Sequence, residues 1–401
     1  MVGLSAMIAS STRSIGSEVY VVHYGEIALK GKNRAYCERA LMRTLALALE
    51  GQGEPRVRKR YGRLLIEGGA PDSSAVLRLV PGIKSFAKAE RVALDIEAIK
   101  DAALRVAEED QAKSFMVRTK RSIKSFPMTS LEVNRLVGER IVRETGKSVS
   151  LKEPELTIYI EICSEEAYVY AERATGLGGL PVGTAGKVVS LISGGIDSPV
   201  AAFLMMERGC RVILVHFFNE TVHSPKVRRK ISLLGEKLAR VQGRTKLYMI
   251  PFGRLQREII KGTPSRYRML VYRRTMLRIA NEVAALEKAK ALVTGDSLAQ
   301  VASQTLDNLA LIYSVSRYPL LAPLIGLDKE ETIRIAEKIG TYEISILPYE
   351  DCCSFMVARH PETHGRPEII AELEKNLALD LAGAISRAEI ESFGPNRSAI
   401  A

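Results

Sequence analysis

The residues with the clearest chemistry form a short glycine-rich loop, Ser193 to Ser198, with the sequence SGGIDS. The loop follows the apolar stretch KVVSLI and precedes PVAAFLMMERG, so it predicts a turn from a strand into a helix. Gly194 and Gly195 let backbone N–H groups approach an anion closely, and the helix directs its positive dipole end at the same point. The loop therefore predicts a site for a polyphosphate.

Asp197 lies inside this loop and would repel a phosphate unless a divalent cation bridges the two groups. Its presence favours a nucleotide bound together with Mg²⁺, and we expect Asp197 to take part in catalysis through that metal. The alternative is a glycine-rich turn in which Asp197 and Ser198 only cap the following helix. The phosphate site is favoured because strand, loop, acid, hydroxyl and helix coincide.

Two adjacent cysteines, Cys352 and Cys353, follow the acidic pair Glu350 and Asp351. A cysteine thiolate is a nucleophile and can also carry a sulfur atom. The alternative is that both are small buried side chains, since free cysteine is often packing material.

The elements that must position these residues follow a regular rhythm beyond residue 187. Short apolar stretches typical of buried strands alternate with amphipathic stretches typical of helices. Strands are expected at 187–192, 211–217, 246–252 and 290–296, and helices at 198–208, 226–241 and 269–288. This α/β rhythm predicts a parallel sheet covered on both faces, with ligands at the carboxyl ends of its strands.

The N-terminal half mixes strands and helices without this rhythm, which predicts an α+β arrangement. A strand is expected from Glu18, with a helix at 35–51, a strand at 60–68, a helix at 131–146 and two strands within 155–173. The segment 173–187 holds five glycines and a proline, which is linker composition. The first sixteen residues are expected to be a flexible leader because they lack the basic start of a secretory signal.

Composition narrows the class of protein. The 401 residues are 46% hydrophobic and 26% charged, enough for two or three packed domains. No stretch approaches the roughly 18 apolar residues of a membrane helix, and five cysteines form no CxxC pair, so we expect a cytoplasmic protein without a membrane partner. The net charge of +12 favours a polyanionic partner, and residues 221–280 hold 16 Lys and Arg against 2 Asp and Glu.

Together these motifs resemble a known family. The SGGIDS loop resembles that of the PP-loop ATP pyrophosphatases, which split ATP between its α and β phosphates. With it, TGDSLAQVASQTLDNL at 294–309, YEDCCSF at 349–355 and VHYGEIALKGKNR at 22–34 resemble the tRNA 4-thiouridine synthetase family in order and spacing. The resemblance runs from about residue 18 to about residue 390.

The resemblance implies a fold and a reaction. It implies a C-terminal parallel-sheet PP-loop domain, of the adenine nucleotide alpha hydrolase-like type, preceded by α+β ferredoxin-like and THUMP domains. The expected boundaries are a leader at 1–16, the ferredoxin-like domain at 17–75, the RNA-binding THUMP domain at 76–174, a linker at 175–186 and the PP-loop domain at 187–401, without a rhodanese domain. The implied reaction adenylates the C4 oxygen of uridine 8 in tRNA and replaces it with sulfur, releasing AMP and pyrophosphate.

The resemblance also implies which residues contact ATP. They are Leu191, Ile192, Ser193, Gly194, Gly195, Asp197, Ser198, His216, Phe217, Arg273, Gly295 and Gln304. Without the resemblance, His216 reads as a core histidine, Arg273 as part of a solvated helix face and Gln304 as a turn or capping residue.

Cys352 matches the essential cysteine of the family, which implies that it carries a persulfide and delivers the outer sulfur. The implied cofactors are ATP and Mg²⁺, and the implied partners are tRNA and a cysteine desulfurase that donates the persulfide. Cys353 or another thiol would resolve the intermediate, and a thiamine sulfur-carrier protein and a homodimer stay open. The basic stretches 113–126 and 226–230 are expected to contact the RNA backbone.

Two other readings remain. One is another PP-loop ATP pyrophosphatase, which forms an amide or transfers sulfur to a carrier protein for thiamine biosynthesis. The other is a tRNA-binding protein without catalytic activity, against which the intact loop residues argue. A cysteine pair that proves dispensable would favour amide chemistry.

Overall fold

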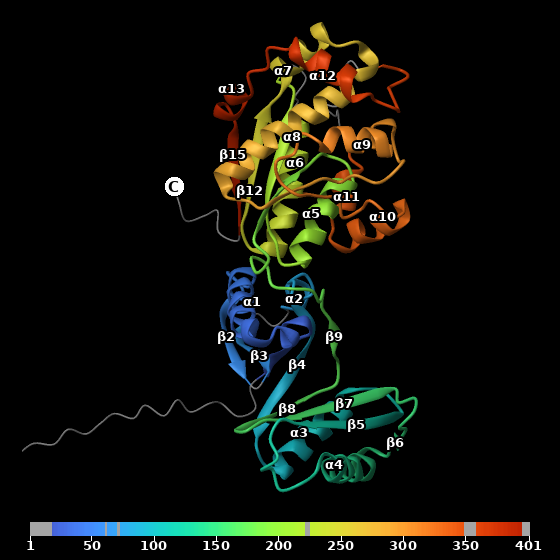
Figure 1. The fold of residues 1–401 in the computed structure, drawn as a ribbon. Coiled ribbons are helices and arrows are strands. Elements are labelled where there is room, and N and C mark those ends of the chain that lie inside the picture. Colours follow the sequence, from blue (N-terminus) through green and yellow to red (C-terminus); the bar gives the residue numbers. More distant parts are fainter. Residues whose placement is uncertain (1–17, 61, 70–72, 221–224, 349–357, 395–401) are drawn as a thin grey trace, which may run out of the picture. The chain divides into compact units, whose positions relative to one another are not determined.

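The structure is a computed structural model that describes residues 18–60, 62–69, 73–220, 225–348 and 358–394. The leader expected at 1–16 and the pair Cys352 and Cys353 lie outside these ranges. The chain divides into two compact units (Figure 1), each made of separate stretches of sequence. The first takes in residues 1–24, 52–72 and 84–175, and the second takes in 25–51, 73–83 and 176–401.

The first unit is built on a nine-stranded mixed sheet. Its elements are β1 (Glu18–Tyr24), β2 (Gly53–Arg60), β3 (Arg63–Gly69), β4 (Ile83–Ala93), α3 (Ile96–Glu109), β5 (Ser114–Arg121), α4 (Ser130–Thr145), β6 (Ser148–Val149), β7 (Leu156–Ile162), β8 (Glu166–Tyr170) and β9 (Ala174–Thr175). The strand order is β2-β3-β1-β4-β8-β7-β5-β6, with β9 paired to β4. Strand β5 runs parallel to β6 and β7, whereas β7 and β8 are antiparallel.

Local sequence explains why α4 forms where it was predicted. The side chain of Thr129 accepts a hydrogen bond from the backbone N–H of Glu132, whose carboxylate accepts one from the backbone N–H of Thr129. Gly146 ends the helix in the left-handed conformation, with φ of 71°. Its buried residues Val133 and Val137 lie four positions apart and pack with α3 against the sheet.

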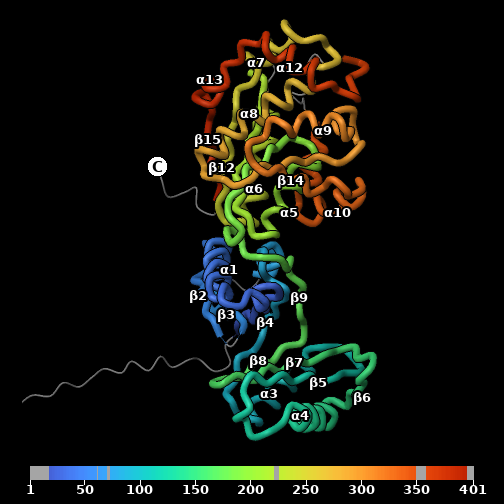
Figure 2. The backbone as a smooth tube through the Cα atoms, viewed as in Figure 1, coloured from blue at the N-terminus to red at the C-terminus, as the bar shows by residue number. Residues whose placement is uncertain are grey.

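The second unit contains the predicted parallel sheet. Its elements are α1 (Arg34–Ala48), α2 (Ser74–Leu77), β10 (Lys187–Leu191), α5 (Asp197–Glu207), β11 (Arg211–Phe218), α6 (Pro225–Gln242), β12 (Thr245–Pro251), α7 (Gly253–Gly262), α8 (Arg268–Glu287), β13 (Ala291–Val293), α9 (Leu306–Tyr313), β14 (Leu320–Leu321), α10 (Lys329–Lys338), α11 (Tyr342–Ser345), α12 (Pro367–Lys375), α13 (Leu381–Ser386) and β15 (Glu389–Phe393). Short 3₁₀ helices cover Glu26–Leu29, Gly31–Asn33, Ser265–Tyr267 and Ala302–Gln304. The strand order is β14-β13-β10-β11-β12-β15, and Figure 2 traces the path of the chain between these strands.

Helices cover both faces of this sheet, as the alternation of strands and helices predicted. Successive residues of β11 point to opposite faces: Ile213 and Val215 pack with α7, α8 and α9, whereas Val212 and Leu214 pack with α5, α6 and α10. Both faces are therefore buried, which explains why these strands read as continuous apolar runs.

The last strand departs from the prediction of a purely parallel sheet. Strand β15 pairs antiparallel with β12 at the edge of the sheet. Of its residues EIESF only Phe393 is buried, as suits an edge strand that is largely in water. Within the described ranges, no helix has both the length and the apolar character needed to cross a membrane.

Candidate nucleotide site

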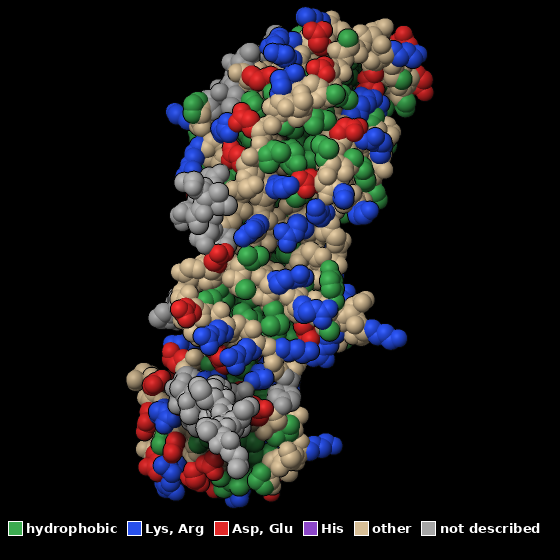
Figure 3. Space-filling model, turned by 90° about the vertical axis from the view of Figure 1, so that its left-hand side faces the viewer, with side chains coloured by type: hydrophobic (Ala, Val, Ile, Leu, Met, Phe, Trp, Pro, Cys, Tyr) green, Lys and Arg blue, Asp and Glu red, His purple; other side chains and the backbone are tan. Residues whose placement is uncertain are grey.

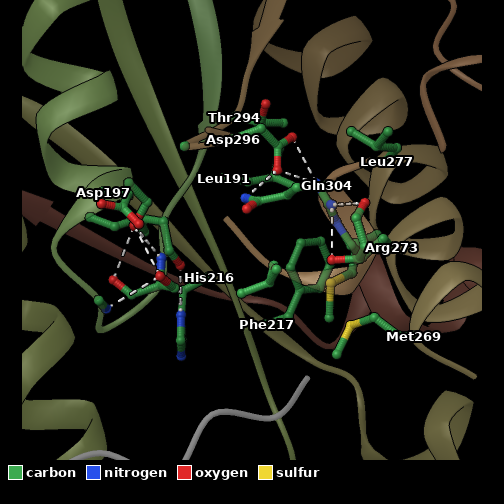
Figure 4. A pocket seen from close by; sticks show the side chains of 18 of the residues that line it. Leu191, Asp197, His216, Phe217, Met269, Arg273, Leu277, Thr294, Asp296 and Gln304 are labelled. Atoms are coloured by element: carbon green, nitrogen blue, oxygen red, sulfur yellow. Dashed lines mark hydrogen bonds and ion pairs between the residues drawn. The ribbon is translucent and has the colours of Figure 1, made fainter. Parts of the chain in front are cut away.

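A pocket of about 440 Å³ opens at the carboxyl ends of β10, β11 and β13 (Figure 4). This is the edge at which parallel α/β sheets bind their ligands. The pocket brings together every predicted ATP-contacting residue except Gly194, which lies buried in the loop itself. The predicted residues that line it are Leu191, Ile192, Ser193, Gly195, Asp197, Ser198, His216, Phe217, Arg273, Gly295 and Gln304.

The glycine-rich loop is shaped by its own serines. The backbone N–H of Ser193 donates to Oγ of Ser198 over 2.8 Å, and the two hydroxyl oxygens lie 3.1 Å apart. Helix α5 begins at Asp197, so its first backbone N–H groups face the loop. The loop thus presents N–H groups, hydroxyls and a helix N-terminus to the pocket, and these are the groups that bind an anion.

Asp197 faces the pocket instead of capping its helix. Its Oδ1 accepts from Nζ of Lys329 over 2.6 Å, and its Oδ2 accepts from Nε2 of Gln300 over 3.1 Å. Ala299, beside Gln300, has a φ of 60°. This left-handed backbone conformation is strained for a residue other than glycine, and such strain recurs at functional sites. Sequence reasoning missed both residues: Lys329 lies in none of the quoted motifs, and Gln300 lies in the motif 294–309, where nothing marks it as a partner of Asp197.

A buried carboxylate organises the opposite side of the pocket. Asp296 is 3% exposed and accepts from Nη2 of Arg273 over 2.6 and 2.7 Å, from the hydroxyl of Tyr313 over 2.8 Å and from Nε2 of Gln304 over 3.1 Å. Burial by itself would raise the pKa of Asp296, but the Arg273 charge and these hydrogen bonds lower it. Burial and the Asp296 charge raise the pKa of Tyr313.

This network shows that Arg273 is not part of a solvated helix face and that Gln304 is more than a turn residue. Sequence reasoning missed Asp296, although it follows Gly295 directly at the end of a strand. Figure 4 shows the links between Asp296, Arg273 and Gln304.

His216 combines the two roles that the sequence left open. It is buried, and its Nδ1 lies 2.9 Å from the carbonyl oxygen of Ile192. Because a carbonyl only accepts, Nδ1 carries the hydrogen and donates it, which holds the ring at the pocket wall. His216 is thus a core histidine that also lines the pocket.

One wall of the pocket is apolar. Phe217 lines it and meets the ring of Phe252 edge-on, with ring centroids 5.5 Å apart. Met269, Met276 and Leu277 of α8 complete this wall (Figure 4). These three residues belong to a helix that was predicted, but its sequence alone does not show which turn faces the pocket.

Position 295 requires glycine because the backbone of Ser198 approaches it closely. A Cβ at this position would lie 2.8 Å from the backbone nitrogen and 2.9 Å from Cα of Ser198. These are backbone atoms at the start of α5, so no side-chain rotation relieves the contact. Any larger residue would push the loop and the strand end apart.

Several cations of the basic segment 221–280 form ion pairs with acids from later in the chain. Arg274 pairs with Glu374 over 2.8 Å, and Arg228 pairs with Glu389 over 2.6 Å. The prediction that residues 226–230 face RNA is wrong for Lys230, which is only 3% exposed. On the face drawn in Figure 3, Lys and Arg side chains lie among Asp, Glu and hydrophobic side chains.

Glu374 is shared by two arginines, since Arg278 also pairs with it over 2.6 Å. Burial would raise its pKa, but hydrogen bonds and charge from Arg274 and Arg278 lower it to about 2. These two ion pairs join α12 to α8, the helix that lines the pocket.

The fold and the site define a class of protein. A glycine and serine loop between a parallel strand and a helix, with an acid facing the pocket and an apolar wall opposite, is the arrangement of a PP-loop nucleotide-binding domain. Three families match successive parts of the chain: the ThiI ferredoxin-like domain at 19–87, the THUMP domain at 93–172 and the thiamine biosynthesis protein (ThiI) at 183–379.

Two similar proteins show to which family the chain belongs. A protein of Thermus thermophilus with the name "Probable tRNA sulfurtransferase" is 44% identical over 381 residues, which are 92% of each chain. One of the same name from Brevibacillus brevis is 41% identical over 94% of this chain and 96% of its own. The chain belongs to the tRNA sulfurtransferase family.

A solved structure agrees with this assignment. The crystal structure of a 4-thiouridine synthetase–RNA complex with bound ATP matches with a TM-score of 0.87 at 35% identity. The match covers 94% of this chain and 99% of the other. The predicted fold class, with a parallel-sheet PP-loop domain after ferredoxin-like and THUMP domains, is therefore confirmed.

Proposed function

We propose that this chain is an ATP-dependent tRNA sulfurtransferase that forms 4-thiouridine at position 8 of tRNA. The observation that carries the proposal is the pocket at the carboxyl edge of the sheet, where a preformed anion loop faces an apolar wall. The family of tRNA sulfurtransferases, and the similar 4-thiouridine synthetase that binds RNA and ATP, support the same reading.

The residues of the pocket fit ATP. The loop Ser193 to Ser198 would hold the phosphates, and the wall that contains Phe217 and Leu277 would hold the flat apolar base. Oε1 of Gln304 is buried and has no hydrogen-bond partner among the described residues, so it offers an acceptor to an amino group such as that of adenine. Arg273 places a positive charge on the same side.

Asp197 would hold Mg²⁺ alongside the phosphates. Its carboxylate lines the pocket, and its two partners are a lysine and an amide that donate to it. A divalent cation prefers carboxylate oxygen and would take the place of these donors. Lys329 would then be released toward the phosphates, which carry the opposite charge.

The chemistry follows from two groups of the chain. Bound ATP supplies the adenylyl group that makes the uridine C4 oxygen a leaving group. The outer sulfur of a persulfide on Cys352, donated by a cysteine desulfurase, would form a bond to C4 while AMP leaves with the oxygen. A second thiol, Cys353 or another, would then cleave the remaining S–S bond, which leaves thiouridine and a protein disulfide.

The remaining partners and boundaries complete the proposal. The domains at 17–75, 76–174 and 187–401, with a linker at 175–186, would divide RNA binding from ATP chemistry. We place the reaction in the cytoplasm, with a thiamine sulfur-carrier protein as a further acceptor and a homodimer as the assembly to test.

One assay tests the proposal. The protein is incubated with tRNA, ATP, Mg²⁺, cysteine and a cysteine desulfurase, and AMP and the near-ultraviolet absorbance of thiouridine are measured. Both products are expected, and tRNA with cytidine at position 8 is the matched control that should give neither. The variant Cys352→Ala should form no thiouridine. A wild-type protein that gives neither product would refute the proposal.

A further inference from the structure

Helix α1 and the 3₁₀ turn before it carry a row of exposed cations around an exposed tyrosine. Lys32, Tyr36, Arg39 and Arg43 follow one another at spacings of four, three and four residues, and all four are exposed. Residues at these spacings lie on the same face of a helix. Lys32 lies in the 3₁₀ turn and the other three lie in α1. We call these four residues the α1 row.

The buried face of α1 fixes the row in the second unit. Cys37, Leu41 and Leu45 are buried, and they too are spaced at four residues. The helix packs against α6. The α1 row therefore belongs to the same compact unit as the nucleotide pocket, whereas the basic stretch 113–126, which the sequence predicted to contact RNA, belongs to the first unit.

The cations of the α1 row have no acidic partner among the residues that the structure describes. The one acid of α1, Glu38, is 1% exposed and pairs with Arg34 over 2.9 Å. Helix α4 differs, because its exposed Arg135 pairs with Glu139 one turn further on. An exposed helix face usually balances its charges in this second way, so the α1 row is free of acids for another reason.

The row weakens the helix that carries it. Arg39 and Arg43 are like charges four residues apart, and such a pair destabilises a helix. Tyr36 is 44% exposed, and its hydroxyl donates to the carbonyl oxygen of Gly183 over 3.3 Å, which holds the outer end of a ring that stays partly in water. Neither the repulsion nor the exposed ring serves the fold, but both suit a negatively charged partner with flat apolar faces.

RNA has the chemistry that matches this arrangement. An aromatic side chain stacks on an unpaired base, and Lys and Arg bind the phosphates of the same strand. Lys32 lies about one turn before Tyr36 and Arg39 about one turn after it, so the phosphates on both sides of a stacked base would each meet a cation. Arg43 extends the row to about 10 Å beyond the ring.

We propose that the α1 row is an RNA-binding surface, on which Tyr36 stacks with an unpaired base and the cations bind the phosphates beside it. The row holds RNA on the unit that contains the nucleotide pocket, so that the strand is fixed relative to the site of ATP chemistry. The inference rests on the proposed function, in which tRNA is the substrate.

The test measures the affinity of the full chain for an unmodified tRNA transcript at several salt concentrations, without ATP or a sulfur donor. Tyr36→Leu removes the aromatic ring, whereas Tyr36→Phe keeps it. Arg39→Gln combined with Arg43→Gln removes two charges of the row. Lys375→Gln combined with Arg387→Gln removes two exposed charges elsewhere in the second unit and is the matched control. The melting temperature and the affinity for ATP are measured for each protein.

Tyr36→Leu is expected to weaken tRNA binding at least about fivefold, as the loss of one stacked base does, whereas Tyr36→Phe should bind within about twofold of the wild type. The double arginine variant should also bind more weakly. Its slope of log affinity against log salt should fall by about 1.4, or about 0.7 for each phosphate contact with a single strand. The control pair should keep the wild-type slope. Melting temperature and ATP affinity should change little, because the altered side chains are exposed.

Wild-type tRNA affinity in Tyr36→Leu or in the double arginine variant would overturn the inference. So would a loss of affinity in Tyr36→Phe as large as that in Tyr36→Leu, because the hydroxyl contact and not the ring would then matter. Unchanged tRNA binding with slower sulfur uptake from a cysteine desulfurase would overturn it in favour of a protein partner. A wild-type protein that binds tRNA in this way but forms no thiouridine would refute the proposed function instead, so the two failures are distinguished.

Discussion

Replacing Asp296 by asparagine should weaken both the fold and the nucleotide site, because this carboxylate is the common partner of Arg273, Gln304 and Tyr313. Asparagine has the same shape but no charge, and one of its two polar atoms becomes a donor. At least one of the three donors then meets another donor. Arg273, whose side chain is only 17% exposed, loses its counter-charge.

The size of the effect follows from burial. Removing one partner of a buried ion pair costs about 3–5 kcal/mol, and the lower end applies here because Arg273 keeps a hydrogen bond to Ser303. A loss of about 3 kcal/mol lowers the melting temperature by roughly 6–12 °C in a domain of this size. If ATP also loses one charge-assisted hydrogen bond, worth about 1.5–3 kcal/mol, its affinity falls about 10- to 100-fold.

The assay pairs thermal unfolding with calorimetric titration of ATP. Asp307→Asn is the matched control, since Asp307 is exposed and paired with an exposed histidine, so it should change the stability by less than about 0.5 kcal/mol. An Asp296→Asn protein with wild-type melting temperature and wild-type ATP affinity would show that the carboxylate does not organise the pocket.

Three further changes probe other parts of the site. Gly295→Ala should weaken ATP binding at least about tenfold, because the new Cβ meets the backbone of Ser198, and unchanged titration curves would contradict this. Lys329→Met should lower ATP affinity about tenfold with little change in melting temperature, because its pair with Asp197 is partly exposed; a wild-type affinity would argue against a role for this lysine. The pKa of Glu374 is lowered from 4.5 to about 2, so its ion pairs stabilise the fold above pH 4.5 and are lost as the pH falls toward 2. The melting temperature of Glu374→Gln should therefore be lower than that of the wild type at pH 7 and should change less between pH 4.5 and pH 2. Parallel pH profiles of the two proteins would contradict the assignment.

Much of the second unit was predictable because its signals are local. The apolar runs of β10, β11 and β12 and the helices between them were expected within a few residues of their observed bounds. A strand buried on both faces must be apolar throughout, so its sequence carries the information by itself. The SGGIDS loop was equally readable, since backbone approach to an anion needs glycine at fixed spacing.

The pairing of charges was not predictable, because it depends on contacts between distant parts of the chain. Arg274 and Lys230 look like surface cations in a segment almost without acids. Their partners are Glu374, a hundred residues further on, and backbone carbonyls near residue 346. A helical wheel shows only that a residue lies on one face of its helix, and the tertiary packing decides what that face meets.

The same limit applies to the site. Arg273 and Gln304 were assigned through the family resemblance. Asp296 shares a motif with Gln304, but the sequence does not show that its carboxylate is hydrogen-bonded to both residues. The role of Cys352 stays a prediction, because residues 349–357 lie outside the part of the chain that the structure describes.

The discontinuous second unit has a consequence for how the protein is made. Its helix α1 packs against α6, and its sheet ends with β15, so the unit joins residues near 40 to residues near 390. During synthesis α1 emerges early, but α6 follows nearly two hundred residues later. The unit thus cannot finish folding until β15 has been synthesised, and such long-range contacts form slowly. We expect the first unit to gain protection from proteases on the ribosome well before the second does.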